Sequence, residues 1–296
     1  MLRLTAQDFD QELLILFDAY VHGSIDRRGF LDRAQKFAVG GVTAVGLLAA
    51  LSPDFAAGQV IAPDDKRLTI QRVEVASPTG YGSIKGYLAR PANAGDKLPA
   101  VLVVHENRGL NPHIEDITRR LALDGYMAFA PDALTPLGGY PGDEDQARAL
   151  FAKLDQSKTR EDFVTATHWL LARSDGNGKV GALGFCYGGG MAHILSVRVP
   201  ELLAAAPFYG NVPAASDAAK VKAPLLIHFA EVDDRINSAW PTYEAALKAA
   251  GVRYTAYQYA GTQHGFNNDT TPRFDANAAK LAWARTLAFF AQTLKA

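Results

Sequence analysis

Runs of hydrophobic residues alternate with amphipathic stretches from about residue 61 to the C-terminus. Residues 98–105 are almost entirely apolar, as expected of a strand that is buried on both faces of a sheet. The alternation predicts an α/β fold with a mostly parallel sheet and helices on both faces, opened by a hairpin. The expected strands are 70–75, 84–89, 98–105, 126–130, 179–184, 204–209, 224–229 and 254–259, and the expected helices include 114–123, 160–172, 187–197 and 278–294.

The first residues of the chain have a different pattern, which divides it into an N-terminal segment, 1–58, and a catalytic domain, 59–296. Arg27 and Arg28 precede an uncharged stretch, 37–53, and together they resemble a twin-arginine export signal. The stretch is short for a membrane span, which needs about 20 apolar residues. This pattern predicts export to the periplasm, without stable insertion in the membrane.

The residues before the two arginines support an alternative to export. They are acidic, and their leucines and Phe17 give them one apolar helical face. The segment would then be an uncleaved helical extension that packs on the body or on a partner subunit. In that case the protein would be cytoplasmic.

Charge and cysteine content exclude several classes of protein. The 296 residues carry a formal net charge of −1, so nothing indicates binding to nucleic acid. The single cysteine allows neither an intramolecular disulfide nor a metal cluster built on cysteines. We therefore expect no metal and no cofactor.

The strongest local signal is Gly184-Phe185-Cys186-Tyr187-Gly188, between an expected strand and an expected helix. It matches the nucleophile elbow G-x-Nu-x-G, with cysteine as the nucleophile. The two glycines are needed because side chains there would collide with neighbouring backbone. The start of a helix also favours the thiolate. Cys186 is therefore the expected nucleophile, although a lone cysteine is more often a small buried hydrophobe.

A base and an acid are expected at the same edge of the sheet as Cys186. His264 follows the strand 254–259 and precedes the last helix, so it is the predicted base. Asp233 follows the strand 224–229 directly and is the predicted acid. Asp234 is a close alternative, and Asp233 could instead pair with Arg235 on the surface.

Backbone N–H groups of Tyr187 and Asn107 are the expected oxyanion hole. The loop that holds Asn107 reads His-Glu-Asn-Arg-Gly, and glycine at its last position means that it is not a zinc-binding helix. Tyr140 and Trp240 are candidates for an apolar substrate pocket. Phe208 and Tyr209 are also candidates, although they could equally be core residues.

From about residue 70 to 294 the sequence resembles the dienelactone hydrolase family of thiol-dependent α/β-hydrolases. The resemblance is carried by residues 105–109, Pro131-Asp132, residues 179–189 and Gln263-His264-Gly265-Phe266. It implies hydrolysis of an ester or lactone by Cys186, His264 and Asp233 through an acyl-enzyme. It also implies that Glu106 contacts and activates the thiol.

The substrate does not follow from this resemblance. Members that act on dienelactone hold the substrate carboxylate with arginines, one shortly after the histidine, whereas this chain has amides there, at Asn267 and Asn268. Arg108 is the expected substitute, with Arg235 as an alternative. A binding protein with the hydrolase fold but without turnover is an alternative function that stays open. A thiol redox function is disfavoured because there is no resolving cysteine. The sequence predicts a small-molecule substrate and leaves the oligomeric state open.

Overall fold

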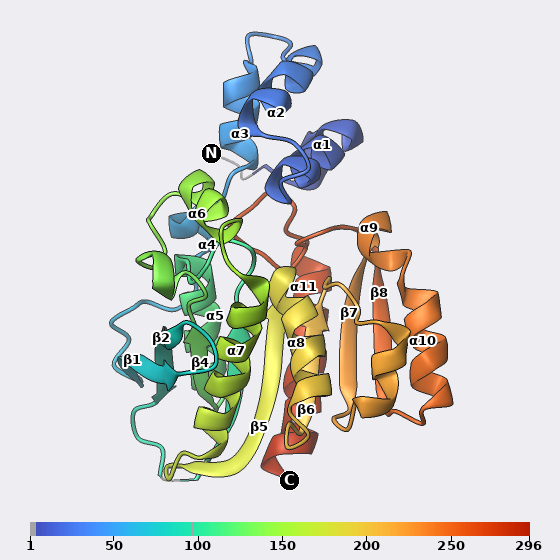
Figure 1. The fold of residues 1–296 in the computed structure, drawn as a ribbon. Coiled ribbons are helices and arrows are strands. Elements are labelled where there is room, and N and C mark those ends of the chain that lie inside the picture. Colours follow the sequence, from blue (N-terminus) through green and yellow to red (C-terminus); the bar gives the residue numbers. More distant parts are fainter. Residues whose placement is uncertain (1–3, 96) are drawn as a thin grey trace.

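Eight strands form one sheet in the computed structural model, which describes residues 4–95 and 97–296 (Figure 1). Their order across the sheet is β1-β2-β4-β3-β5-β6-β7-β8. Long apolar runs form the central strands because both of their faces are covered. The strands are β1 (Leu68–Ser77), β2 (Gly82–Pro91), β3 (Leu98–Val104), β4 (Met127–Pro131), β5 (Gly176–Phe185), β6 (Ala204–Phe208), β7 (Leu225–Val232) and β8 (Tyr254–Gln263).

Six neighbouring strands, from β4 to β8, run parallel. The β1–β2 hairpin adds to their edge, because β2 pairs antiparallel with β4. Parallel strands bring their carboxyl ends to the same edge of a sheet, which is where ligands bind in open α/β sheets. The loops after β3, β5, β7 and β8 therefore meet at one place.

Helices cover both faces of the sheet (Figure 1). One hydrophobic core joins the sheet to α6, α7, α8 and α10, and a second joins it to α5 and α11. The helices of the body are α5 (Pro112–Leu123), α6 (Glu144–Phe151), α7 (Gln156–Leu171), α8 (Tyr187–Arg198), α9 (Asp234–Asn237), α10 (Trp240–Ala249) and α11 (Ala276–Phe290), with short 3-10 turns at Thr135–Leu137 and Ala215–Lys220 and a π-helical end at Ala291–Lys295.

The N-terminal helices lie over the carboxyl edge of the sheet (Figure 1). They have a small hydrophobic cluster of their own, in which the rings of Phe17, Tyr20 and Phe30 lie 5.4–6.3 Å apart. This cluster is separate from the two cores of the body. These helices are α1 (Gln11–Val21), α2 (Arg27–Ala34) and α3 (Ala44–Leu51), with 3-10 turns at Ala6–Asp8 and Gln35–Phe37, whereas α4 (Phe55–Gly58) contributes nothing to this cluster and contacts α5.

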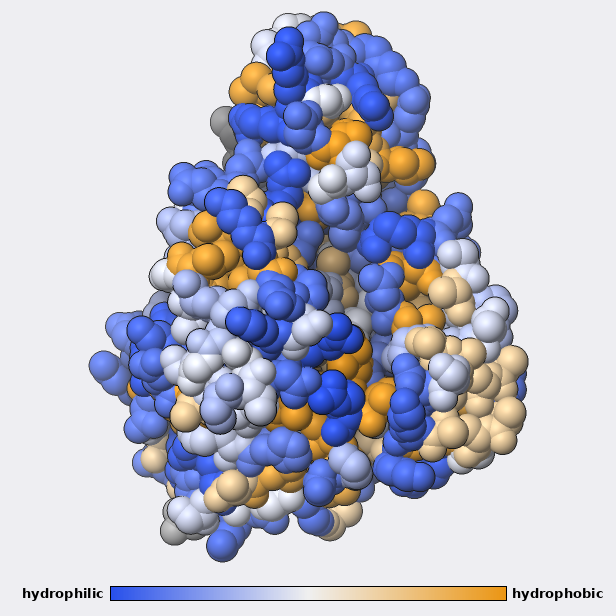
Figure 2. All heavy atoms as spheres, viewed as in Figure 1, coloured by the Kyte–Doolittle hydropathy of each residue, from blue (hydrophilic) through white to orange (hydrophobic). Residues whose placement is uncertain are grey.

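Polar contacts attach α1 and α2 to the body. Arg148 donates to the carbonyl of Tyr20 at 2.9 Å and stacks on its ring. Arg273 pairs with Asp18 at 3.2 Å, and Arg27 pairs with Asp145 at 2.7 Å. Figure 2 shows a hollow beneath these helices on the face in view. The N-terminal helices are thus held to the body largely by charge and hydrogen bonds.

The expected strands and the α/β class are confirmed. Helices α6 and α10 had no residue range among the expected helices, and the structure supplies their bounds. Helix α7 begins four residues before the expected start, because Asp155 caps it by accepting hydrogen bonds from the N–H groups of Ser157 and Lys158.

The N-terminal residues form helices, and a signal function for them stays a prediction. Arg27 and Arg28 are the first two residues of α2, which Asp26 caps. Within residues 4–95 and 97–296, no helix has the length and apolar character needed to cross a membrane.

The N-terminal cluster predicts that Phe30→Ala will loosen these helices. Phe30 is fully buried, so its loss should cost the segment about 3–5 kcal/mol. We expect faster proteolysis at the exposed Val39 and Val42 without a change in unfolding of the body. Ile15→Ala, on the exposed face of α1, is the control. Equal cleavage of the two variants would show that the cluster does not hold the helices.

Candidate active site

Cys186 lies on a tight turn between β5 and α8 (Figure 1). Its φ of 55° is rare for a residue with a side chain, so the turn is strained. A Cβ on Gly184 would lie 1.9 Å from the carbonyl oxygen of Gly188, and one on Gly188 would lie 2.1 Å from that of Val104. Only glycine fits at these two positions. The predicted elbow is therefore present, with Cys186, which is 8% exposed, at its apex.

His264 and Asp233 reach the same edge from the ends of β8 and β7. Nδ1 of His264 lies 2.6 Å from Oδ2 of Asp233, and both side chains are buried. Asp234 is the exposed first residue of α9, so the structure pairs His264 with Asp233 rather than with its neighbour. Nε2 of His264 is buried and has no hydrogen-bond partner among the described residues.

A second histidine lies on the sulfur, and the sequence analysis missed it. Nε2 of His22, at the end of α1, is 3.3 Å from Sγ of Cys186. The rings of His22 and His264 meet edge to face, with centroids 4.7 Å apart. Nothing in the sequence around His22 indicates this contact, because it depends on how the N-terminal helices dock.

The charges around Cys186 favour a thiolate. Burial alone would raise the pKa of Cys186, but the positive charges of His22 and His264 outweigh it and lower the pKa to about 6. Burial likewise opposes charge on His264, yet the thiolate and the Asp233 hydrogen bond raise its pKa to about 10. The pKa of His22 is also raised, since the thiolate and Asp18 outweigh its burial. The thiolate–imidazolium form therefore prevails at neutral pH.

The loop after β3 carries the predicted oxyanion donor Asn107 and the predicted activator Glu106. The side chain of Asn107 donates to the carbonyl of Val21 at 3.0 Å, which ties this loop to α1. Tyr187 opens α8, so its N–H belongs to the first turn, whose donors have no carbonyl partner within the helix. Glu106 lines the same cavity as Cys186 and accepts a hydrogen bond from Asn268 at 3.0 Å. Its contact with the thiol stays a prediction.

The cavity at Cys186 is small, about 50 Å³, which is room for only a few water molecules. Residues of α1, the loops after β3 and β8, and the start of α6 enclose it. Its lining residues are Phe17, Tyr20, Val21, Ser52, Pro53, Glu106, Asn107, Arg108, Glu144, Asp145, Cys186, His264, Asn268, Thr271 and Arg273. Arg273 was not foreseen; it is nine residues after His264 in the sequence, and its ion pair is with Asp18 of α1.

The three predicted substrate-binding residues differ in their location. Arg108 lines the cavity and donates to the carbonyl of Val21 at 3.1 Å. Tyr140 does not line the cavity. Its hydroxyl donates a hydrogen bond to Glu144, a lining residue, at 2.9 Å. Trp240 packs on Phe229 in the body, with ring centroids 5.0 Å apart, rather than at the cavity. Trp240 is thus a core aromatic and not a residue of this cavity. The sequence shows only that it comes after the strand β7, and this does not distinguish the two locations.

Three side chains at this site could hold a metal ion. One ligand atom each from His22, Cys186 and His264 lies within 4.8 Å of the other two. A thiolate and two imidazoles are ligands that zinc accepts. His264 already bonds to Asp233 through its other nitrogen, as metal-bound and catalytic histidines both do. The set is therefore compatible with a metal and equally with thiol chemistry.

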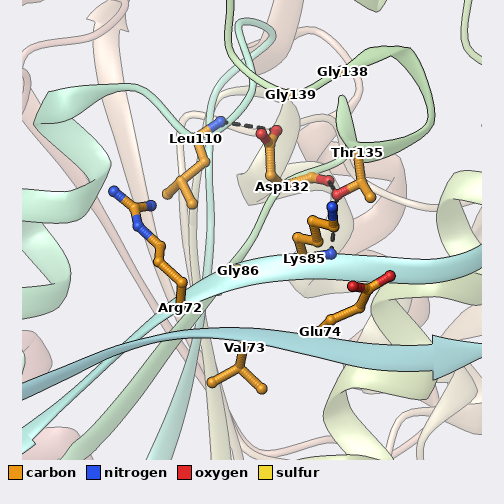
Figure 3. Close-up of a pocket in the computed structure, with 10 residues that line it drawn as sticks. All are labelled: Arg72, Val73, Glu74, Lys85, Gly86, Leu110, Asp132, Thr135, Gly138 and Gly139. Atoms are coloured by element: carbon orange, nitrogen blue, oxygen red, sulfur yellow. Dashed lines mark hydrogen bonds between the residues drawn. The ribbon is translucent and has the colours of Figure 1, made fainter.

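A larger cavity, of about 440 Å³, lies at the β1–β2 hairpin (Figure 3). Its acid, Asp132, already accepts backbone hydrogen bonds from Leu110, Leu134 and Tyr140, which fix the loop after β4. Figure 3 shows one of these bonds, from Leu110. The thiol and the imidazole of the predicted triad do not line this cavity, so the active site is assigned to the smaller one. The lining residues are Arg72, Val73, Glu74, Lys85, Gly86, Leu110, Asp132, Thr135, Gly138 and Gly139.

The parallel sheet, the elbow after β5, and an acid and a histidine after β7 and β8 define an α/β-hydrolase fold. The model of the dienelactone hydrolase family matches residues 84–294, and the chain belongs to that family. It is therefore a hydrolase, of a family that acts on ester and lactone bonds. A separate family model, described as YqhI-like, matches residues 1–39.

Known relatives agree with this assignment. A putative carboxymethylenebutenolidase of Escherichia coli O157:H7 is 31% identical over 262 residues, which are 83% of this chain and 95% of that protein. The putative hydrolase fragment YghX of Escherichia coli (strain K12) is 46% identical over 114 residues, 38% of this chain and 97% of the fragment. The crystal structure of a putative dienelactone hydrolase from Klebsiella pneumoniae, 29% identical, superposes with a TM-score of 0.67 over 76% of this chain and 99% of that one.

The charges at the site predict how the thiol reacts with iodoacetamide. Because the thiolate is the nucleophile, the alkylation rate should rise with pH around a midpoint of about 6 and then stay level. The chain has one cysteine, so the protein unfolded in urea is a matched control and should show a midpoint near 8.5, the usual value for a thiol. A folded-state midpoint as high as that of the control would contradict the charge assignment.

Proposed function

We propose that the protein hydrolyses a small ester or lactone, with Cys186 as nucleophile, His264 as base and Asp233 as the acid that orients it. One observation carries the proposal: an elbow thiol and a ring nitrogen of His264 lie within 4.8 Å, and the other side of that ring is bonded to a buried carboxylate. This is the arrangement that nucleophilic catalysis requires.

The reaction would proceed in two steps. The thiolate attacks the carbonyl carbon, and the N–H groups of Tyr187 and Asn107 stabilise the oxyanion. The C–O bond to the alcohol then breaks, and the alcohol leaves with a proton from the His264 imidazolium. Water gives a proton to neutral His264 and attacks the resulting thioester, the C–S bond breaks with its electron pair returning to sulfur, and the acid is released. In a lactone the alcohol stays attached to the acyl group as part of the same product.

The cavity limits the substrate class. A volume of about 50 Å³ does not hold even a small ester without displacement of residues that line it. Of the cavity's two arginines, Arg108 lies 3.6 Å from Glu144 and Arg273 lies 3.2 Å from Asp18. Their charges are thus partly balanced, which favours a neutral or weakly charged ester over one that needs two free cations.

Cys186→Ala should lower the turnover of p-nitrophenyl acetate and of small lactones by roughly a thousandfold or more, because the residue that forms the acyl-enzyme is lost. Circular dichroism should show an unchanged fold, since alanine faces the same backbone strain at this turn. Full turnover by this variant would end the proposal. No turnover by the wild-type protein on such a panel would favour a binding protein of hydrolase fold.

Two adjacent carboxylates give a matched pair for the acid. Asp233→Asn should lower kcat by about a hundredfold or more, because an amide at this position favours the wrong tautomer of His264. Asp234→Asn, one residue further on the exposed start of α9, should leave kcat unchanged. Equal effects of the two variants would remove Asp233 from the proposed triad.

Export is a separate proposal, and the packing of the N-terminal helices bears on it. A signal cleaved near Ala56-Ala57 would take α1 and its contacts with Cys186 away from the mature protein. The fit of α1 to the active site supports a retained helical extension. We therefore expect N-terminal sequencing of the protein from its natural host to find a start that precedes α1. A start near residue 58 would instead support twin-arginine export to the periplasm.

A further inference from the structure

Side chains of the body fix the end of α1 in the active site, one residue after another. Arg148 donates to the carbonyl of Tyr20 at 2.9 Å. Asn107 and Arg108 donate to the carbonyl of Val21 at 3.0 and 3.1 Å. The next residue is His22, whose side chain is 12% exposed. Its place beside the sulfur is thus set by three donors, two of them in the loop that would hold the oxyanion.

The proton on His22 can be placed from its neighbours. Nδ1 lies 2.8 Å from the carbonyl oxygen and 3.2 Å from a carboxylate oxygen of Asp18, and both of these are acceptors. Nδ1 therefore carries a hydrogen in either charge state. Nε2 is then the nitrogen that gains or loses a proton, and it lies 3.3 Å from Sγ of Cys186.

His264 has the complementary arrangement. Its Nδ1 bonds to Asp233 at 2.6 Å, and its buried Nε2 has no hydrogen-bond partner among the described residues. One imidazole is therefore engaged with the sulfur, and the other has a nitrogen available to an incoming molecule. Hydrolysis of an ester by a thiol needs proton transfer at the sulfur and at the substrate oxygens, and the site holds two Asp–His pairs.

We propose that His22 is a further catalytic residue of the hydrolysis proposed above, on which this inference rests. His22 takes the proton of the Cys186 thiol and stabilises the thiolate. His264 gives a proton to the alcohol and takes one from water. The N-terminal helices are then part of the active site. Without them the body would keep its triad but lack this second base.

The proton transfers balance as follows. The S–H proton moves to Nε2 of His22, and the thiolate forms a C–S bond with the carbonyl carbon. As the C–O bond breaks, the alcohol oxygen takes the Nε2 proton of the His264 imidazolium. Neutral His264 then takes a proton from the attacking water, and the C–S bond breaks with its electron pair returning to sulfur. The carboxylic acid is released, the sulfur takes its proton back from Nε2 of His22, and both imidazoles end in the state in which they began.

Charged groups from four elements face His22. Asp18 of α1 and the Cys186 thiolate favour its protonated form, whereas the charge of His264 opposes it. Arg273 pairs with Asp18 at 3.2 Å, and Arg235 of α9 lies beside the ring of His22. Nη2 of Arg235 lies 3.1 Å from Nε2 of His22 and can donate to it only while that nitrogen is unprotonated. Unprotonated Nε2 can accept a hydrogen bond from Arg235, and protonated Nε2 can donate one to the thiolate.

The test removes the imidazole and then returns it in solution. In His22→Ala, the burst of p-nitrophenol from p-nitrophenyl acetate at neutral pH should slow by roughly tenfold or more, because the pKa of Cys186 moves towards its usual value and less thiolate is present. Added imidazole should restore part of that rate, and the later hydrolysis of the acyl-enzyme should be unchanged. His168→Ala, an exposed histidine of α7, is the control and should match the wild type.

A second measurement is independent of turnover. The midpoint of iodoacetamide alkylation should move from about 6 towards the usual value for a thiol in His22→Ala, because the charge next to the sulfur is lost. His22→Gln can fill the space and donate a hydrogen bond but cannot take a proton. The His22→Gln variant should keep the fold and still show the slow burst. It therefore tests the role of His22 even if the alanine variant does not fold.

The outcomes separate this inference from the proposed function. A normal burst and a normal alkylation midpoint in both His22 variants, with Cys186→Ala inactive, would overturn the role of His22 and leave the hydrolase proposal intact. Loss of activity with no shift in midpoint and no rescue by imidazole would make His22 a structural residue and overturn the inference as well. Full activity of Cys186→Ala would overturn both.

Discussion

The turn at Cys186 is the constraint on which the site depends. Backbone packs directly on backbone there, because Gly184 and Gly188 leave no room for a Cβ and Cys186 adopts a positive φ. The turn follows β5, which lies between β3 and β6 in the middle of the sheet. The sulfur therefore has a fixed position above the carboxyl edge, and strain at the turn is offset by the buried strands around it. Every other group proposed for catalysis has to reach that fixed point.

Three groups do so by two different physical routes. Asp233 and His264 arrive because β7 and β8 run parallel to β5 and end at the same edge. His22 arrives because α1 docks across that edge, with its last residues held by the side chains of Asn107, Arg108 and Arg148. The packed core of the sheet fixes the positions of Asp233 and His264. The second route depends on polar contacts, which are weaker and more easily broken than a packed apolar interface.

The same charges dock the N-terminal helices and tune the thiol. Asp18 pairs with Arg273 of the body and bonds to His22, and these neighbours lower its pKa despite burial. A buried thiol alone would have a raised pKa, so its low value depends on imidazoles on both sides. Docking and electrostatics are therefore coupled: the contacts that hold α1 in place also supply one of the two charges that stabilise the thiolate.

The sequence by itself determined the α/β class, the elbow and the order of Cys186, Asp233 and His264, because strand periodicity and glycine at a tight turn are local signals. It left Asp234 open, took Trp240 for a pocket residue, and gave no role to His22. Only the tertiary structure decided these points. A contact between residues 164 positions apart, made through docked helices, depends on the packing of the whole chain and leaves no pattern in the neighbourhood of either residue.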